Sequence, residues 1–171
     1  ETAGLKVKIL VGGYKAYRNE VLAIFDRPIP FRVLGGKTGS GKTEILPELA
    51  KRGHQVLDLE GLAHHRGSAF GHLGLEAQPT SEHFENEVYR VLSGFDYSRE
   101  IWVEDESRHI GKVFMSAPLY NQLREAPIVF LDIEAIYRLP HLVHVYASYP
   151  KEDLATDLDK LKKRLGLDRY A

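Results

Sequence analysis

The fold is decided by the stretch Gly36-Lys37-Thr38-Gly39-Ser40-Gly41-Lys42-Thr43, which matches the pattern G-x-x-x-x-G-K-[ST] at every fixed position. Glycines let such a loop wrap closely around phosphate, with successive backbone N–H groups directed inward. Lys42 supplies a mobile cation for the terminal phosphate oxygens, and Thr43 supplies a hydroxyl for Mg²⁺. These eight residues are therefore predicted to bind a di- or triphosphate.

The sequence on either side of this loop has the strand–loop–helix order that such a site needs. Phe31–Gly35 reads as a short buried strand, and residues 42–52 read as a helix whose positive dipole end adds to the anion site. Further strands are predicted at 55–59, 100–103 and 128–132, and further helices at 80–95, 117–126, 134–149 (interrupted at Pro140) and 153–165. This alternation predicts an α/β fold of the P-loop NTPase type, a parallel sheet with helices on both faces.

The first residues form a unit of their own in the sequence pattern. Residues 5–11 alternate apolar and polar side chains as a strand does, and residues 14–25 have apolar side chains at helical spacing. Residues 27–30 contain two prolines and read as a linker. The predicted division is 1–27, the end of a preceding domain, and 28–171, the P-loop domain.

Carboxylates follow two of the predicted strands, where a Mg²⁺ ligand is needed. Glu104, Asp105 and Glu106 come directly after one apolar run, and Asp58 and Glu60 belong to the other. We favour Glu104 and Asp105 as catalytic carboxylates, with Thr43 and Asp105 as the metal ligands. For Glu106, a solvated surface charge is an equally good interpretation.

Two polar loops are predicted at the same edge of the sheet, because ligands bind beyond the carboxyl ends of parallel strands. In the first, Arg66 is suited to pair with phosphate and Ser68 to donate a hydrogen bond, while His64 and His65 are candidates for acid–base roles. In the second, Ser107 and Arg108 follow the acidic strand. Together with Asp58 and Glu60 they are the candidate substrate loop, and Arg66 joins Lys42 as a candidate catalytic residue.

Composition excludes several classes of protein. The chain has 171 residues, no cysteine and a formal net charge of -1. It therefore carries no disulfide, zinc–thiolate site, iron–sulfur cluster or cysteine nucleophile, and a strongly basic, sequence-blind nucleic-acid binder is disfavoured. No apolar run approaches the ~20 residues that cross a bilayer, so we expect a cytoplasmic protein with no membrane partner.

Several blocks together resemble the P-loop domain of the tRNA 2-selenouridine synthase family. They are Gly35–Thr43, Asp58-Leu-Glu-Gly-Leu-Ala-His-His-Arg-Gly-Ser-Ala-Phe-Gly71, Gln78-Pro79, Phe84-Glu85-Asn86 and Trp102-Val-Glu-Asp-Glu-Ser-Arg-His-Ile-Gly111. The resemblance covers residues 31–166, and Gly12–Arg18 is similar to the last turn of the rhodanese domain that precedes the P-loop domain in that family.

The resemblance implies a tRNA-modifying transferase that acts on wobble 2-thiouridine. Such an enzyme transfers a geranyl group from geranyl diphosphate to sulfur, then replaces it with selenium from selenophosphate to give 2-selenouridine. It implies Mg²⁺ as cofactor, small phosphorylated substrates, and tRNA and the rhodanese domain of the full-length chain as partners, with ATP or GTP as other ligands for the loop. Phe70 would line a prenyl pocket or serve in the core.

The chain departs from the family at two points. The rhodanese cysteine that the selenium step needs has no counterpart here, and residues 134–138 read Glu-Ala-Ile-Tyr-Arg where the family has a Glu-Arg pattern, which puts a role for Arg138 in doubt. Candidates for tRNA contact are basic residues near both ends, namely Lys15, Arg18, Arg27, Lys160, Lys162, Lys163 and Arg164, although a solvated helix face explains most charge runs. The alternatives are a small-molecule kinase using ATP–Mg²⁺, with Asp58 and Glu60 orienting an acceptor hydroxyl, and a non-catalytic nucleotide sensor.

Overall fold

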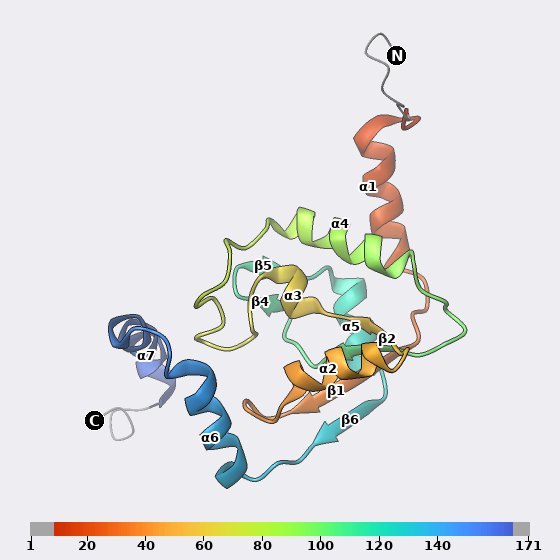
Figure 1. The fold of residues 1–171 in the computed structure, drawn as a ribbon. Coiled ribbons are helices and arrows are strands. Elements are labelled where there is room, and N and C mark those ends of the chain that lie inside the picture. The colour runs from red at the N-terminus through yellow and green to blue at the C-terminus, as the bar shows by residue number, and fades with distance from the viewer. Residues whose placement is uncertain (1–8, 166–171) are drawn as a thin grey trace, which may run out of the picture.

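The computed structural model describes residues 9–165, with side chains described up to residue 159. Figure 1 shows a body built around one sheet, from which α6 and α7 extend on the side away from α1. In chain order the elements are α1 (Gly13–Ile24), β1 (Phe31–Gly36), α2 (Lys42–Lys51), β2 (Gln55–Leu57), α3 (Leu59–Ala63), α4 (Ser81–Leu92), β3 (Ile101–Glu104), β4 (His109–Ile110), β5 (Val113–Phe114), α5 (Ala117–Glu125), β6 (Ile128–Leu131), α6 (Ala135–Tyr146) and α7 (Lys151–Leu165).

The four-stranded sheet is parallel and has the order β2-β3-β1-β6. The strand that leads into the P-loop is central, since Val33 of β1 pairs with Val103 of β3 on one side and with Ile128 of β6 on the other. Parallel strands bring their carboxyl ends to one edge, so the loops after β1, β2, β3 and β6 all leave the sheet on the side of the P-loop. The predicted α/β fold with a parallel sheet flanked by helices is confirmed.

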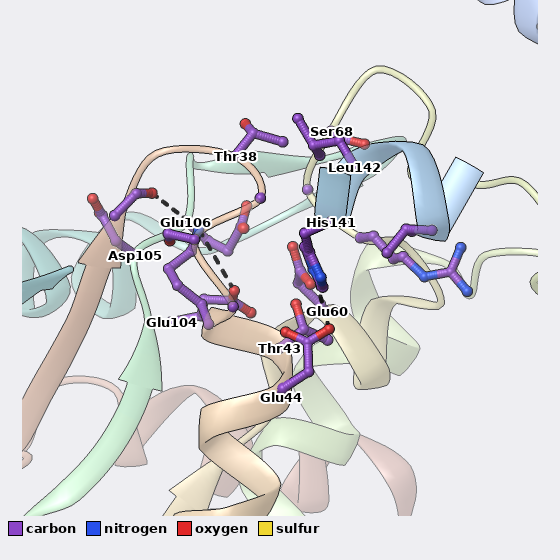
Figure 2. Close-up of a pocket in the computed structure, with 18 of the residues that line it drawn as sticks. Thr38, Thr43, Glu44, Glu60, Ser68, Glu104, Asp105, Glu106, His141 and Leu142 are labelled. Atoms are coloured by element: carbon purple, nitrogen blue, oxygen red, sulfur yellow. Dashed lines mark hydrogen bonds and ion pairs between the residues drawn. The ribbon is translucent and has the colours of Figure 1, made fainter. Parts of the chain in front are cut away.

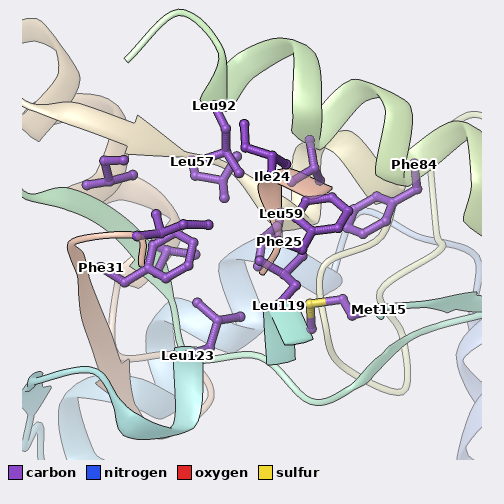
Figure 3. Packing of buried hydrophobic residues seen from close by; sticks show 14 of the residues in the cluster. Ile24, Phe25, Phe31, Leu57, Leu59, Phe84, Leu92, Met115, Leu119 and Leu123 are labelled. Atoms are coloured by element: carbon purple, nitrogen blue, oxygen red, sulfur yellow. The ribbon is translucent and has the colours of Figure 1, made fainter. Parts of the chain in front are cut away.

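The main hydrophobic core lies between one face of this sheet and α1, α4 and α5 (Figure 3). Phe31 and Val33 of β1 contribute from the sheet, and Phe84 of α4 is fully buried above them. Successive strand residues face opposite sides. Leu34 is accordingly buried outside this cluster, on the face against which α2 packs. Burial on both faces explains why Phe31, Val33 and Leu34 of β1 are all apolar, and Arg32 near the start of the strand is paired with Glu100.

The N-terminal helix α1 packs against α4. Arg18 forms an ion pair with Glu85 and donates a 2.9 Å hydrogen bond to Asn86, while Val21 and Phe25 enter the main core. The assignment of residues 1–27 to a preceding domain stays a prediction. The strand predicted over 5–11 is wrong for residues 9–11, which lie in irregular structure, and its other residues lie outside the described part.

Other local predictions also need correction. The strand expected over 55–59 ends at Leu57, because Asp58 caps α3 by accepting a 2.7 Å hydrogen bond from the Gly61 N–H. Pro140 does not interrupt α6, since a proline removes one backbone hydrogen bond and can leave the helix continuous on both sides. The hairpin β4–β5 was not predicted at all. No helix among residues 9–165 combines the length and the apolar character that a membrane span requires.

Candidate phosphate-binding site

The P-loop joins the carboxyl end of β1 directly to the first turn of α2. Gly39 and Gly41 adopt φ values of 81° and 85°, the left-handed region that favours glycine. Gly41 is also the N-cap of α2, so the free N–H groups of the first helical turn open into the loop. The Lys42 ammonium donates a 3.0 Å hydrogen bond to the carbonyl of Gly36 across the loop.

This loop forms one wall of a cavity of about 470 Å³ (Figure 2). The other walls are the residues that follow β2 and β3 and one side of α6. The lining residues are Gly36, Thr38, Gly39, Ser40, Gly41, Lys42, Thr43, Glu44, Glu60, Arg66, Gly67, Ser68, Glu104, Asp105, Glu106, Ser107, His141, Leu142, Val145 and Tyr146. The structure thus brings the predicted phosphate-binding loop together with carboxylates and with Arg66 in one cavity. Lys37 is exposed and does not line it.

Three buried carboxyl groups stand beside Lys42. Glu60, Glu104 and Glu106 each offer an oxygen, and these oxygens all lie within 4.8 Å of one another. The Lys42 Nζ lies 3.9 Å from Glu104 Oε1, and Glu60 Oε2 is buried with no hydrogen-bond partner. Glu106, which was equally well explained as a surface charge, is only 9% exposed and belongs to this group.

Crowding of these carboxyls changes their protonation. Burial, followed by the charges of Glu104 and Glu106, raises the pKa of Glu60 to about 10. Burial also raises the pKa of Glu104 to about 7, although Lys42 opposes the shift, and it raises the pKa of Glu106. Near neutral pH the group therefore holds at least one proton unless a cation binds.

Asp105, which was predicted together with Glu104, is placed differently. Its carboxylate forms an ion pair with Arg124 of α5, at the border of the cavity. Neighbouring residues at a strand end face opposite sides, so Glu104 and Glu106 share the side that Asp105 does not. The role of Asp105 as a metal ligand with Thr43 stays a prediction.

The loop after α3 contributes to the site through the backbone as well as through its side chains. His64 ends α3 with a φ of 51° and its Nδ1 lies 3.1 Å from the carbonyl of Ala77. Arg66 donates hydrogen bonds to the carbonyl of Leu73 and the hydroxyl of Tyr149, at 3.0 and 3.2 Å. These bonds hold the Arg66 guanidinium at the cavity wall.

The remaining loop residues divide between the cavity and its supports. Ser68 lines the cavity and lies 2.8 Å from the Tyr146 hydroxyl. His65 is buried with an unpartnered Nδ1, and burial, aided by the charge of His72, lowers its pKa. Phe70 lines neither cavity of this region and packs against Tyr146, with ring centroids 5.4 Å apart.

A second cavity of about 270 Å³ adjoins the first. Thr43, Glu60 and Arg66 line both cavities, and the second is completed by Asp58, Gly61, His64, His65, Leu75 and Glu76. Most of the predicted substrate loop thus surrounds this space. Ser107 lines the first cavity instead, and Arg108 lines neither, since its guanidinium stacks on the ring of Phe114.

The contribution of α6 was missed from the sequence. His141, Leu142, Val145 and Tyr146 line the phosphate cavity, and His141 Nε2 lies 3.3 Å from Glu44 Oε1. Arg138, whose role was in doubt, donates a 2.9 Å hydrogen bond to the carbonyl of Thr38 in the P-loop. The segment after β6 lies here because β6 is the neighbour of β1, which the sequence pattern alone does not reveal.

The role of the basic residues in tRNA contact stays a prediction. Arg18 is engaged with Glu85 and Asn86 on α4, and Lys15 and Arg27 are exposed. Lys160, Lys162, Lys163 and Arg164 lie outside the residues whose side chains are described.

The chain is similar to known proteins of one family. The family model described as the tRNA 2-selenouridine synthase AAA domain matches residues 29–171. The curated tRNA 2-selenouridine synthases of Sulfurovum sp. and Serratia proteamaculans are 36% and 34% identical to the chain over 98% of its length. The match to the protein of that name from Nitrosomonas eutropha is 37% identical over 76% of the chain and covers 34% of the relative.

These relatives are longer proteins, and the chain spans about half the length of the first two. The matched region includes the P-loop, the buried carboxylates and α6. The chain belongs to the tRNA 2-selenouridine synthase family.

Proposed function

We propose that this chain is the diphosphate-binding part of a tRNA-modifying transferase that geranylates wobble 2-thiouridine from geranyl diphosphate and then exchanges the geranyl group for selenium from selenophosphate. The observation that carries the proposal is the cavity that the P-loop, Lys42 and Arg66 line together. The names of the relatives support tRNA as the substrate and 2-selenouridine as the product.

The P-loop residues suit the loss of diphosphate. When sulfur bonds to C1 of the prenyl chain, the bond from C1 to the diphosphate oxygen breaks and its electron pair stays on that oxygen. Negative charge therefore grows where the loop amides and Lys42 supply donors, and donors fixed in advance stabilise such charge most. Arg66, held by Leu73 and Tyr149, would contact the same group from the loop after α3. The 2-thiouridine would then enter the second cavity, which shares Arg66 with the first.

The donor set also fits Mg²⁺. The hydroxyl of Thr43 and the carboxylates of Glu104, Glu60 and Glu106 are the hard oxygen ligands that this ion prefers, and the unpartnered Glu60 Oε2 has room for a cation in place of a proton. Bound Mg²⁺ would neutralise charge on the departing diphosphate. The ammonium of Lys42, 3.9 Å from Glu104 Oε1, lies beside this donor set.

Calorimetric titration with geranyl diphosphate, pyrophosphate and ATP, each with and without Mg²⁺, tests this proposal. We expect geranyl diphosphate to bind, and the Lys42→Ala variant to bind it at least 10-fold more weakly, because a charge-assisted hydrogen bond is lost. Lys51→Ala is the matched control, since this exposed lysine ends the same helix and, within the described part of the chain, pairs with Glu48 alone. Tight ATP binding with phosphoryl transfer to a metabolite, and no binding of geranyl diphosphate, would refute the proposal in favour of a kinase.

A further inference from the structure

The hairpin β4–β5 presents a basic and aromatic surface that the diphosphate site does not use. His109 pairs with Phe114 across the hairpin, so their side chains share the exposed face, whereas Ile110 and Val113 pair on the buried face. The exposed fraction of the Phe114 side chain is 37%, although its hairpin neighbours Ile110 and Val113 are fully buried. We call Arg108, His109, Lys112 and Phe114 the hairpin platform.

The aromatic ring of this platform is fixed in orientation. The guanidinium carbon of Arg108 lies 4.2 Å from the centre of the Phe114 ring, and the His109 ring meets it edge-on at 4.7 Å. Arg108 itself donates a 3.3 Å hydrogen bond to the carbonyl of Met115. A flat ring held in this way has little side-chain entropy left to lose when a second flat group stacks beside it.

The backbone beneath the platform is equally constrained. The Gln78 amide donates to the carbonyl of Ile110 at 2.9 Å and accepts from the Lys112 N–H at 2.7 Å, which closes the turn at Gly111. The Phe114 N–H donates to Ser81 at the start of α4 at 2.9 Å. Side chains of Ile110, Val113 and Met115 anchor the hairpin in the core. The platform is thus a rigid surface.

The charge of the platform is uncompensated. Among the described residues, no carboxylate lies within ion-pair distance of Arg108 or Lys112, and residues 107–115 contain no acidic side chain. A fixed aromatic ring with cations beside it suits the binding of single-stranded RNA, because the ring stacks on a base and the cations contact phosphates. An acidic peptide would use the cations but not the ring.

The platform also lies near the proposed reaction site. Ser107 lines the phosphate cavity, and only Arg108 separates it in sequence from His109, the strand partner of Phe114. Along this path the Cα of Phe114 is no more than roughly 13 Å from that of Ser107. A nucleotide next to the one being modified would reach such a surface.

From these contacts we infer that the hairpin platform stacks a base of the RNA adjacent to the modified nucleotide, with Phe114 as the stacking surface and Arg108 and Lys112 as phosphate contacts. This inference rests on the proposed function for its substrate, tRNA. It adds a recognition surface that lies outside both cavities.

The test is binding of a labelled RNA stem-loop with 2-thiouridine in its loop, followed by fluorescence anisotropy. Phe114→Leu, which keeps an apolar side chain and removes the aromatic face, is expected to weaken binding at least 5-fold, and Phe114→Tyr to restore it. Phe130→Leu is the matched control, because Phe130 is an exposed phenylalanine of β6, 52% accessible. Log affinity falls as log salt rises, and Lys112→Gln should make this negative slope shallower by roughly 0.7, the amount expected for one lost phosphate contact.

A second arm leaves the protein unchanged. Two further stem-loops each carry one abasic site, placed before or after 2-thiouridine. One of the two should bind the parent protein at least 5-fold more weakly than the intact stem-loop does. For that RNA, Phe114→Leu should weaken binding no further. Equal affinity for all these RNAs, no saturable binding by the parent, or equal competition by polyglutamate would each overturn the inference. Geranyl diphosphate binding should be unchanged in Phe114→Leu. Failure of the platform therefore remains distinct from failure of the diphosphate site.

Discussion

Replacing Glu60 with glutamine is expected to remove much of the pH dependence of stability between pH 7 and pH 9. In the folded chain the pKa of Glu60 is raised to about 10 by burial and by its carboxylate neighbours, whereas the ordinary value is 4.5. A carboxyl with a raised pKa stabilises the fold fully below its unfolded pKa, and that stability is lost as the pH rises toward its folded pKa. Between pH 7 and pH 9 the folded state therefore holds a proton that the unfolded state lacks.

The size of the effect follows from this one proton. Each pH unit lowers the free energy of unfolding by about 1.4 kcal/mol, and the two units of the window lower it by roughly 2 to 3 kcal/mol. For a chain of this size the melting temperature should fall by roughly 5–10 °C. The pKa of Glu104 is raised only to about 7, and that of His65 is lowered, so both groups contribute mainly below this window. The raised pKa of Glu106 acts in the same direction as that of Glu60 and is present in both the parent and Glu60→Gln.

Thermal melts in EDTA at several pH values, followed by circular dichroism, measure this dependence. Between pH 7 and pH 9 the melting temperature of Glu60→Gln should fall much less than that of the parent. Glu125→Gln, a change at an exposed glutamate that ends α5, is the control and should follow the parent. Parallel pH profiles for the parent and Glu60→Gln would show that Glu60 does not hold the proton.

Three further outcomes are expected. At pH 9, Mg²⁺ should raise the melting temperature of the parent but not of Glu60→Gln, and equal shifts would place the cation elsewhere. Gly39→Ala should weaken pyrophosphate binding several-fold in calorimetry, because φ is 81° there and a Cβ would meet the side chain and backbone of α6 at 2.7 and 3.0 Å; unchanged affinity would mean that α6 does not constrain the loop. Arg18→Ala should lower the free energy of unfolding in urea by roughly 2–3 kcal/mol, because it leaves Glu85 buried and unpaired. Arg32→Ala breaks an exposed pair and should lower it by less than about 1 kcal/mol, and equal losses would contradict this ranking.

The strand, loop and helix of the P-loop could be predicted from the sequence because that motif is local. Its strand, loop and helix are contiguous, and their roles follow from residue type and spacing alone. The same holds for the alternation of strands and helices, which sets the fold class. Whether α6 continues past Pro140 could not be predicted in the same way, because it depends on how far the loss of one backbone hydrogen bond disrupts the helix.

The carboxylate group could be predicted only in part, because it joins the ends of two strands. Glu104 and Asp105 look equivalent in sequence, and only the side to which each strand residue faces separates the buried Glu104 from the ion-paired Asp105. Glu60 joins Glu104 because β2 is the neighbour of β3, which follows from the strand order. The hairpin β4–β5 escaped prediction because strands of two residues have no measurable period.

The wall common to the two cavities has a thermodynamic consequence. Thr43, Glu60 and Arg66 touch both spaces, so a ligand that repositions or recharges any of them in one cavity changes the other. Such coupling is reciprocal: whatever factor a diphosphate contributes to nucleoside affinity, the nucleoside must contribute to diphosphate affinity. A proton on Glu60 would enter the same cycle, so the proposed diphosphate and nucleoside would form one linked set of equilibria with the hydrogen ion, and the affinity for each would depend on the concentrations of the other two.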